Sequence, residues 1–302
     1  MTKETTTINT NADDTRQRFF IDNSPVRGDV VHISAALKTI LKQREYPNAI
    51  KLMLGEMLAA AALLATTLKF KGRLSLQAQG SGSLKWVMAE CTDQGELRGL
   101  AELEEGVDFN DLETSADALD ALTDAVLFIN IEHQHGERYQ GIIPLEEPTI
   151  AGCLSQYYLL SAQVPTQICL ACDGEHAAGL LVQLLPRNNE AEQELTDTDL
   201  WPRLTILTQT LKSKELIELP AQDILHRLYH EEDVRLPNAE PLKFGCTCSR
   251  ERCIDALKQV GKDAVTEILS TEDEIQMDCQ FCNTPYRFSP VQAIELFGLK
   301  VS

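Results

Sequence analysis

The stretch Cys246-Thr-Cys-Ser-Arg-Glu-Arg-Cys253, with Cys279-Gln-Phe-Cys282 further along, decides how the carboxyl-terminal part of this chain folds. Two close cysteine pairs, Cys246 with Cys248 and Cys279 with Cys282, lie about thirty residues apart, a spacing typical of tetrahedral four-cysteine zinc sites. We therefore predict that these four cysteines bind one Zn²⁺. A single residue lies between the first two cysteines. This spacing is tight for a purely structural site and is a first indication that the site can be reversibly disassembled.

The segment around the pairs is predicted to be a small module that depends on its metal. Ser249 is expected to cap a helix that ends at Gly261, and shorter elements are expected at 263–269, at 286–288 and from Pro290 onward. Few large apolar side chains are available, so a core alone does not easily keep such a module folded. Zinc binding supplies on the order of 10–16 kcal/mol in modules of this kind and is coupled to folding.

The same coupling makes the module sensitive to oxidation. Metal-bound sulfurs are thiolates, which peroxide and hypochlorous acid attack. Oxidising one pair to a disulfide removes two ligands at once, and the lost binding energy can match a domain's whole margin of stability. Four thiolates on Zn²⁺ leave a formal charge of −2, which Arg250 and Arg252 are placed to offset in part.

The residues alone leave three other interpretations of the cysteine pairs to consider. Spacing by itself favours a permanently closed zinc ribbon. A nucleic-acid-binding ribbon is disfavoured by a net charge of −19, with 46 acidic against 27 basic residues, and by the absence of a basic and aromatic cluster. A catalytic zinc needs an open coordination position, which four thiolates rarely leave.

Composition places the whole chain among soluble globular proteins. The 302 residues allow two domains, or one domain and a small module, and 43% hydrophobic with 24% charged residues is ordinary. We expect a frayed start at 1–14 rather than a signal peptide, and residues 52–68 are too short and charged for a membrane span. Nine cysteines without a leader indicate a reducing compartment, where cysteine pairs bind metal or do redox chemistry.

Residues 1–190 are predicted to form one α+β domain built mainly on antiparallel sheet. A helix is expected after Ser34, and the Ala- and Leu-rich stretch to Leu68, apolar nearly all round, indicates a buried core helix. Alternating apolar residues and turn signals predict the remaining elements: strands at 17–33, a meander at 72–79, 84–90 and 97–103, a hairpin at 126–132 and 139–145, a helix at 149–162, and strands at 166–171 and 178–185.

Polar and reactive groups elsewhere in this domain receive structural interpretations. Gly80-Ser-Gly82 is a hairpin turn rather than a phosphate loop, since no Lys-Ser/Thr follows it. The acidic stretch 102–120 is a solvated connection rather than a metal site. His133 and His135 are expected at the surface. Four cysteines are expected to be small hydrophobic side chains of the core: Cys91, Cys153, Cys169 and Cys172.

Residues 191–240 are predicted to form a metastable helical linker. Helices are expected from Thr198-Asp199 and from Leu219-Pro220, each near the length at which an isolated helix is marginal in water. They should stay folded only while both ends are held. His226 and His230 lie one helical turn apart, but without the adjacent glutamate of a zincin motif a structural role is favoured over a metal site. Pro237 and Pro241 mark a hinge into the cysteine module, 241–302.

These residues resemble a known family. Arg227-Leu-Tyr-His-Glu-Glu232, Cys246–Cys253 and the closing Cys279/Cys282 pair are similar to the redox-regulated bacterial chaperones called heat shock protein 33, or 33 kDa chaperonin. The resemblance extends to Glu137-Arg-Tyr-Gln-Gly141 and Thr67-Leu-Lys-Phe70 and so covers nearly the whole chain. The extension before Arg16 departs from the family pattern.

The resemblance implies a cytoplasmic holdase that is not an enzyme and uses no ATP. It implies one Zn²⁺ per chain in the reduced, inactive state, bound by Cys246, Cys248, Cys279 and Cys282. Oxidation is then expected to form Cys246–Cys248 and Cys279–Cys282 disulfides, release zinc and unfold the linker. Cys253 matches a family position that is not a ligand.

The expected partners also come from the resemblance. They are unfolding client proteins, a second copy of the chain when oxidised, and ATP-driven chaperones that receive the clients, with no nucleic acid and no membrane. The competing hypothesis is a constitutive zinc-ribbon adaptor, which would keep its zinc or show no anti-aggregation activity after peroxide treatment.

Overall fold

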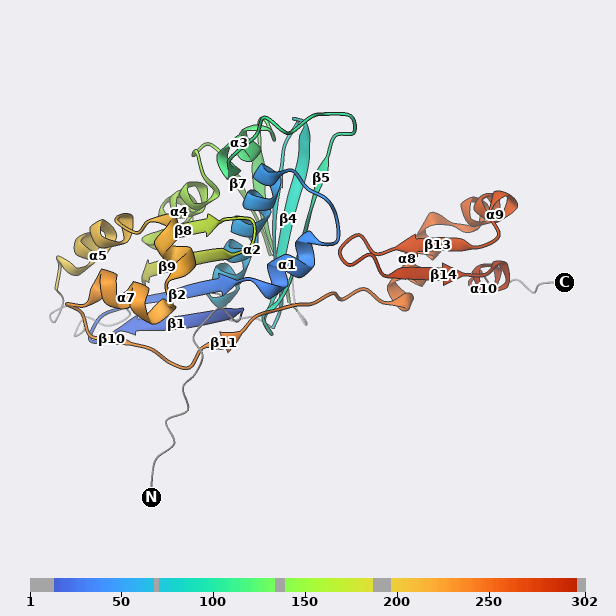
Figure 1. Ribbon diagram of the computed structural model, residues 1–302. Coiled ribbons are helices and arrows are strands. Elements are labelled where there is room, and N and C mark those ends of the chain that lie inside the picture. Colours follow the sequence, from blue (N-terminus) through green and yellow to red (C-terminus); the bar gives the residue numbers. More distant parts are fainter. Residues whose placement is uncertain (1–13, 68–70, 134–138, 187–196, 298–302) are drawn as a thin grey trace, which may run out of the picture. The chain divides into compact units, whose positions relative to one another are not determined.

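The computed structural model describes residues 14–67, 71–133, 139–186 and 197–297 (Figure 1). The chain divides into two compact units, 1–244 and 245–302. The three-part division into domain, linker and module stays a prediction, because compactness does not say which segment unfolds. The frayed start, the polar boundary before residue 197, His135 and most of the Thr67–Phe70 motif lie outside the described residues.

Two six-stranded sheets make up the framework of the described part of the first unit. The first sheet has the order β10-β1-β2-β9-β8, and β11 also pairs with β1; its pairs are all antiparallel. Its strands are β1 (Thr15–Ile21), β2 (Val26–Ile33), β8 (Thr166–Cys172), β9 (Ala177–Leu184), β10 (Val234–Arg235) and β11 (Glu240–Pro241).

The second sheet has the order β12-β5-β4-β3-β6-β7, and only its β12–β5 pair is parallel. Its strands are β3 (Gly72–Gln79), β4 (Leu84–Thr92), β5 (Glu96–Leu103), β6 (Val126–His133), β7 (Tyr139–Pro144) and β12 (Lys243–Phe244). The predicted meander and hairpin are therefore confirmed. Gly80 and Gly82 lie in the turn between β3 and β4, where an added Cβ would lie within about 2.1 Å of backbone oxygens of Leu122 and Ala121.

The helix α2 (Asn48–Thr67) lies between the two sheets and forms the centre of the core (Figure 1). By length and composition it could cross a membrane, yet 78% of its apolar window is buried inside the protein. The helix is apolar on all sides because it packs against β4 on one side and β9 on the other. The prediction of a buried core helix is confirmed by its buried side chains, among them Met53, Leu54, Met57, Leu58, Leu63 and Leu64.

Three helices cover the face of the first sheet that points away from α2 (Figure 1). They are α5 (Leu200–Gln209), α6 (Ser213–Glu218) and α7 (Ala221–Tyr229). Alternation along the strands produces this second apolar face, because Val31 and Leu181 point toward α2 while Phe19, Val30 and Leu180 point toward the helices. The linker helices were expected to stay folded only while both ends are held. In this structure they share a second hydrophobic core with the sheet.

Two local features at helix starts differ from the sequence-based expectation, the cap of α1 and the presence of a helix in the acidic connection. Ser34 occupies the N-cap position of α1 (Ala35–Leu41), but its side chain makes no capping hydrogen bond. The Asp14 carboxylate accepts hydrogen bonds from the backbone N–H groups of Ser34, Ala35 and Ala36 instead, so Asp14 is no part of a frayed start. The acidic connection contains α3 (Ser115–Asp120), which a Thr114/Asp117 capping box begins.

Residues 234–244, here called the strap, run along the first unit as short edge strands. β10 and β11 pair with β1, and β12 pairs with β5, so Pro241 lies beside a strand rather than at a free hinge. Gly95 contacts the strap at a positive φ of 73°, and a Cβ there would lie 2.6 Å from the Pro241 oxygen. The strap therefore fastens the chain that leaves α7 to both sheets.

The second unit is small. It contains α8 (Arg250–Val260), α9 (Lys262–Thr271), β13 (Ile275–Asp278), β14 (Pro285–Phe288) and α10 (Pro290–Glu295). Ser249 caps α8 by accepting from the Arg252 N–H, and Gly261 ends it at φ 95°, as predicted. β13, which pairs with β14, was not predicted. Among the described residues its fully buried apolar core consists of Leu257, Val265, Ile275, Phe288 and Ala293.

Candidate metal centre

The four predicted cysteines meet at one point of the second unit. Cys246 and Cys248 lie in the loop before α8, while Cys279 and Cys282 lie in the turn between β13 and β14. Their sulfurs all lie within 4.8 Å of one another. The Cys246 and Cys279 sulfurs are 3.6 Å apart, and those of Cys248 and Cys282 are 3.4 Å apart. All four are half-buried, and none of them forms a disulfide.

This arrangement suits a tetrahedral ion. Four sulfurs bound at about 2.3 Å around a tetrahedral centre lie about 3.8 Å from one another. The separations of 3.4 and 3.6 Å are close to that value, so only small side-chain rotations would seat an ion. The four-cysteine cluster can therefore hold a metal, and an all-sulfur donor set favours a soft or borderline cation.

A tight turn positions the second pair. The N–H groups of Cys282 and Asn283 both donate to the Cys279 carbonyl, and the Cys279 N–H donates to the Thr284 carbonyl. Asn283 adopts φ 52°, a left-handed conformation that asparagine tolerates better than most residues. The pairing of β13 with β14 fixes both ends of this turn, and its two sulfurs lie within 4.8 Å of each other.

Two side chains that the sequence did not single out contact the sulfurs. The Tyr286 hydroxyl donates to Cys248 Sγ at 3.1 Å, and the Thr284 hydroxyl lies 3.1 Å from Cys282 Sγ. Residues of this kind orient ligands and tune their charge. They could have been noticed from the strand period, since Tyr286 and Phe288 alternate with Arg287, but the contact itself depends on the turn.

Burial and hydrogen bonding give Cys279 and Cys282 different pKa values. Burial raises the pKa of Cys279 to about 12. Burial also acts to raise the pKa of Cys282, but hydrogen bonds from Thr284 and neighbouring thiols outweigh it and lower that pKa to about 7. The hydrogen bond from Tyr286 to Cys248 raises the pKa of the Tyr286 hydroxyl, which therefore stays protonated and able to donate. Cys282 is therefore a stronger acid than Cys279 and forms a thiolate more readily.

The two arginines expected to offset the thiolate charge have different positions. Arg252 Nη1 donates to the Thr247 hydroxyl at 2.8 Å, between the first two cysteines. Arg250 instead donates to the Arg287 carbonyl and the Gln292 side chain, and its guanidinium lies 4.3 Å from the centre of the Phe288 ring. Arg252 thus remains a candidate for charge compensation, whereas Arg250 joins α8 to α10.

The remaining cysteines are not part of the cluster. Cys253 lies on α8 and packs against the small core of the second unit. Cys91 and Cys153 are buried, and Cys169 and Cys172 are half-buried on β8, on opposite faces of the first sheet. Burial raises the pKa of Cys91 and Cys172 to about 12 and that of Cys169 to about 11, so their thiols stay protonated, as expected of core residues.

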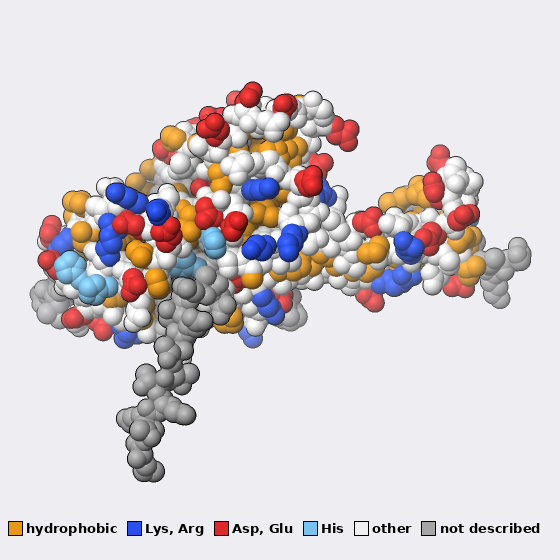
Figure 2. Space-filling view, viewed as in Figure 1, with side chains coloured by type: hydrophobic (Ala, Val, Ile, Leu, Met, Phe, Trp, Pro, Cys, Tyr) orange, Lys and Arg blue, Asp and Glu red, His pale blue; other side chains and the backbone are white. Residues whose placement is uncertain are grey.

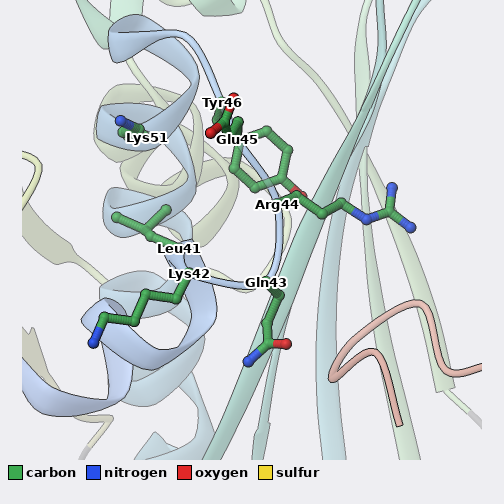
Figure 3. Close-up of a pocket in the computed structure, with 7 residues that line it drawn as sticks. All are labelled: Leu41, Lys42, Gln43, Arg44, Glu45, Tyr46 and Lys51. Carbon is green, nitrogen blue, oxygen red and sulfur yellow. The ribbon is translucent and has the colours of Figure 1, made fainter. Parts of the chain in front are cut away.

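The hollow at the turn between α1 and α2 is lined by residues 41–46 and Lys51 (Figure 3). Its cationic side chains do not converge, because Figure 3 shows Lys42 and Lys51 on one side and Arg44 extending to the other. Arg44 pairs with Glu102 at 3.3 Å, and the Tyr46 hydroxyl bonds to the backbone of Ala101. The hollow therefore lacks the geometry of an anion site.

Comparison with known proteins identifies the family. The model of the Hsp33 protein family matches residues 14–289. The 33 kDa chaperonins of Shewanella loihica and Ectopseudomonas mendocina are 40% and 42% identical to this chain, with 94% of this chain and 96% and 95% of theirs covered. The chain belongs to the Hsp33 family. Hsp33 proteins are non-enzymatic chaperones, so the resemblance noted in the sequence is confirmed.

A solved Hsp33 structure supports the fold. The crystal structure of the 33 kDa chaperonin of Thermotoga maritima matches with a TM-score of 0.77 at 22% identity, over 94% of this chain and 98% of that one. The α+β class with antiparallel sheets and a carboxyl-terminal four-cysteine cluster is thereby confirmed.

Proposed function

We propose that this chain is a redox-regulated holdase that works without ATP. In the reduced state Cys246, Cys248, Cys279 and Cys282 bind one Zn²⁺ and the protein is inactive. Oxidation forms the Cys246–Cys248 and Cys279–Cys282 disulfides, releases zinc and frees the linker, 191–240, from the domain at 1–190. Membership of a chaperone family and a sulfur cluster of suitable geometry support this proposal.

The observation that carries the proposal is the second hydrophobic core. Helices α5–α7 cover Phe19, Val30, Leu180 and Val182, each fully buried on the outer face of the first sheet. Removal of the helices would uncover a continuous apolar surface on a rigid sheet. Monomeric proteins rarely expose such surfaces unless they bind something there. Unfolding proteins, which expose apolar side chains, are the partners that fit it.

The chain connection supports a coupling between metal and linker. Gly245 is the single residue between β12 of the strap and Cys246 of the cluster. Each strap strand is two residues long, so few hydrogen bonds hold it, and such segments open at low free-energy cost. When zinc leaves and its module unfolds, the strap loses the ordered segment that immediately follows it.

The remaining parts of the proposal follow the family and the composition. The oxidised form is proposed to be a homodimer in the cytoplasm that passes its clients to ATP-driven chaperones. A net charge of −19 opposes binding to nucleic acid and to anionic membrane surfaces.

The test combines metal release with chaperone activity. Zinc-loaded, reduced protein is treated with peroxide at raised temperature, and zinc release, a cysteine oxidation map and suppression of client aggregation are followed together. The proposal expects loss of one zinc per chain, the two stated disulfides and the appearance of anti-aggregation activity. Retained zinc, or released zinc without such activity, contradicts it and favours the constitutive zinc-ribbon adaptor.

A further inference from the structure

Two histidines lie side by side at the exposed carboxyl-terminal end of linker helix α7, His226 in its last turn and His230 as its C-cap residue. His226 and His230 are four residues apart, both exposed, with ring centroids 6.1 Å apart and ring planes inclined by 38°. Figure 2 shows histidine side chains gathered on the surface of the first unit where α7 lies. On the sequence alone a structural role is favoured, but a structural histidine normally packs or bonds inside the protein, and these two are exposed.

The ring nitrogens of this pair are available to a ligand. Within the described part of the chain, the imidazoles contact each other and neither has a hydrogen-bond or ion-pair partner. The cation between them in sequence, Arg227, is drawn away by an ion pair with Glu215 on α6. Exposed carboxylates of Asp223 and Glu231 lie close in sequence on the same helix and its end, and they favour a bound cation.

The geometry is that of a chelating pair on a helix. Side chains at i and i+4 lie on one face, the spacing that helix-borne histidine ligands of zinc use. Two imidazoles bound to one ion at about 2.0–2.1 Å through nitrogen have ring centres about 5 Å apart. The observed 6.1 Å needs only a small side-chain rotation to reach that value.

The opposite face of α7 holds the pair in place. Ile224, Leu225, Leu228 and Tyr229 are at most 2% exposed and pack in the second hydrophobic core. The backbone between the two histidines is therefore fixed, and an ion binding both rings does not have to order it first.

We propose that His226 and His230 form a second metal site for a divalent transition ion of borderline softness, such as Zn²⁺ or Ni²⁺, with water as the remaining ligands. The two rings share one face only when α7 is helical. The ion consequently binds the folded linker and not the unfolded one. At a free-ion concentration 100 times the dissociation constant, it shifts the linker's folding equilibrium about 100-fold toward the docked state. This regulatory consequence rests on the proposed function, whereas ion binding does not.

Nickel binding to the reduced, zinc-loaded, full-length protein tests the site. Ni²⁺ is titrated by calorimetry into wild type, His226→Ala and His230→Ala, while retention of zinc by the cysteine cluster is monitored. A matched variant, His230→Ala with Glu231→His, keeps the number of histidines but breaks their spacing. His176→Ala removes an exposed histidine of the β8–β9 turn, one that already pairs with Asp173, and serves as the control. Amide exchange of α7 is compared with and without Ni²⁺.

The expected result is one additional Ni²⁺ bound by wild type and by His176→Ala, at least about 10-fold more tightly than by the other variants, since two linked ligands act as one chelate. Slower amide exchange of α7 should accompany it only in those two proteins. Equal binding by all variants, or equal binding by the spacing variant and wild type, overturns the proposal. Because no oxidant is used, such a failure leaves the proposed redox function unaffected.

Discussion

At the scale of single residues, the metal centre depends on more than its four sulfurs. Tyr286 and Thr284 each place a hydroxyl 3.1 Å from a cluster sulfur. A donor at a thiolate withdraws charge from it, which strengthens its orientation toward the metal and lowers its reactivity. We therefore expect these two residues to help set how tightly the proposed zinc is held and how fast the cysteine pairs are oxidised.

Replacing Tyr286 by phenylalanine tests this contribution. The ring and its packing stay, but the hydrogen bond to Cys248 is lost. Zinc affinity should fall about 10-fold, the lower end of the range for such partners, and zinc should leave at lower peroxide concentrations. Competition with a chelator measures the zinc affinity. An affinity equal to that of wild type would show that the Tyr286 hydroxyl does not contribute to zinc binding.

His32 on β2 should make linker docking depend on pH. Its Nε2 lies 3.0 Å from the Leu216 carbonyl of α6, and burial lowers its pKa from the ordinary 6.5, outweighing hydrogen bonds to the Leu216 and Leu219 carbonyls. Its cross-strand neighbours Thr15 and Ala178 are uncharged. On α6, Glu215 pairs with Arg227 and Glu218 with Lys214.

The direction of the pH effect on linker docking follows from the lowered pKa of His32. Above about pH 6.5 the imidazole is neutral whether the linker is docked or free, and docking keeps its full stability. Below that pH the free form takes up a proton that the docked form resists, so docking weakens as pH falls. Linker proteolysis should therefore rise between pH 7.5 and 5.5 in wild type.

His32→Gln keeps a donor for the Leu216 carbonyl but cannot titrate, so it should show a smaller rise. Burial also raises the pKa of Asp29 and, to about 7, that of Glu56. Both proteins contain these two groups, so any effect of their titration cancels in the comparison. Identical pH profiles would contradict the role of His32.

Some of these single-residue features could be predicted from the sequence, and others could not. The ligand set depends on residue type and spacing, which are visible in the chain. The cap of α1 and the donors to sulfur are not, because Asp14 comes from another element and the Thr284 and Tyr286 contacts depend on a left-handed turn at Asn283.

At the scale of elements, docking of α7 on the first sheet combines packing with one buried hydrogen bond. The Tyr229 hydroxyl lies 2.5 Å from the Thr208 hydroxyl of α5, and its ring centroid is 6.0 Å from that of Phe19 on β1. One side chain thus joins two linker helices to the sheet. Burial raises the pKa of Tyr229, so the hydroxyl stays protonated.

Substitutions at Tyr229 separate the two contributions. Tyr229→Phe removes the hydrogen bond and should destabilise docking by about 1 kcal/mol. Tyr229→Ala also leaves a cavity and should cost about 3–5 kcal/mol, enough to free the linker with zinc still bound. Limited proteolysis of the linker at increasing temperature measures both. Equal resistance of the alanine variant and wild type would show that α7 does not depend on this core.

Elements with a clear period were predictable, and among the short elements α3, α6 and β13 were not. α2 is apolar on all sides over twenty residues, and the meander alternates cleanly. α3 and α6 have six residues each and β13 has four, too few for a period to show. Both faces of β2 and β9 are apolar, which indicates burial on two sides but not which segment covers the second side.

At the scale of the whole molecule, the four cysteines should act as a unit. Cys279→Ser should lower zinc affinity by more than about 100-fold, since loss of a ligand exceeds loss of a supporting residue. Its chaperone activity should no longer change with peroxide. Cys253→Ser, outside the cluster, is the matched control and should switch like wild type. A Cys279→Ser protein that still switches would mean that one pair suffices.

In the proposed mechanism, oxidation of the cysteine cluster releases helices α5–α7 from the first sheet. Hydrogen–deuterium exchange of the zinc-loaded protein, before and after peroxide treatment at raised temperature, tests it most directly. After oxidation we expect the amides of α5–α7 to lose their protection, while those of α2 keep theirs. Unchanged protection of α5–α7 in a sample that has lost its zinc and prevents client aggregation would contradict it.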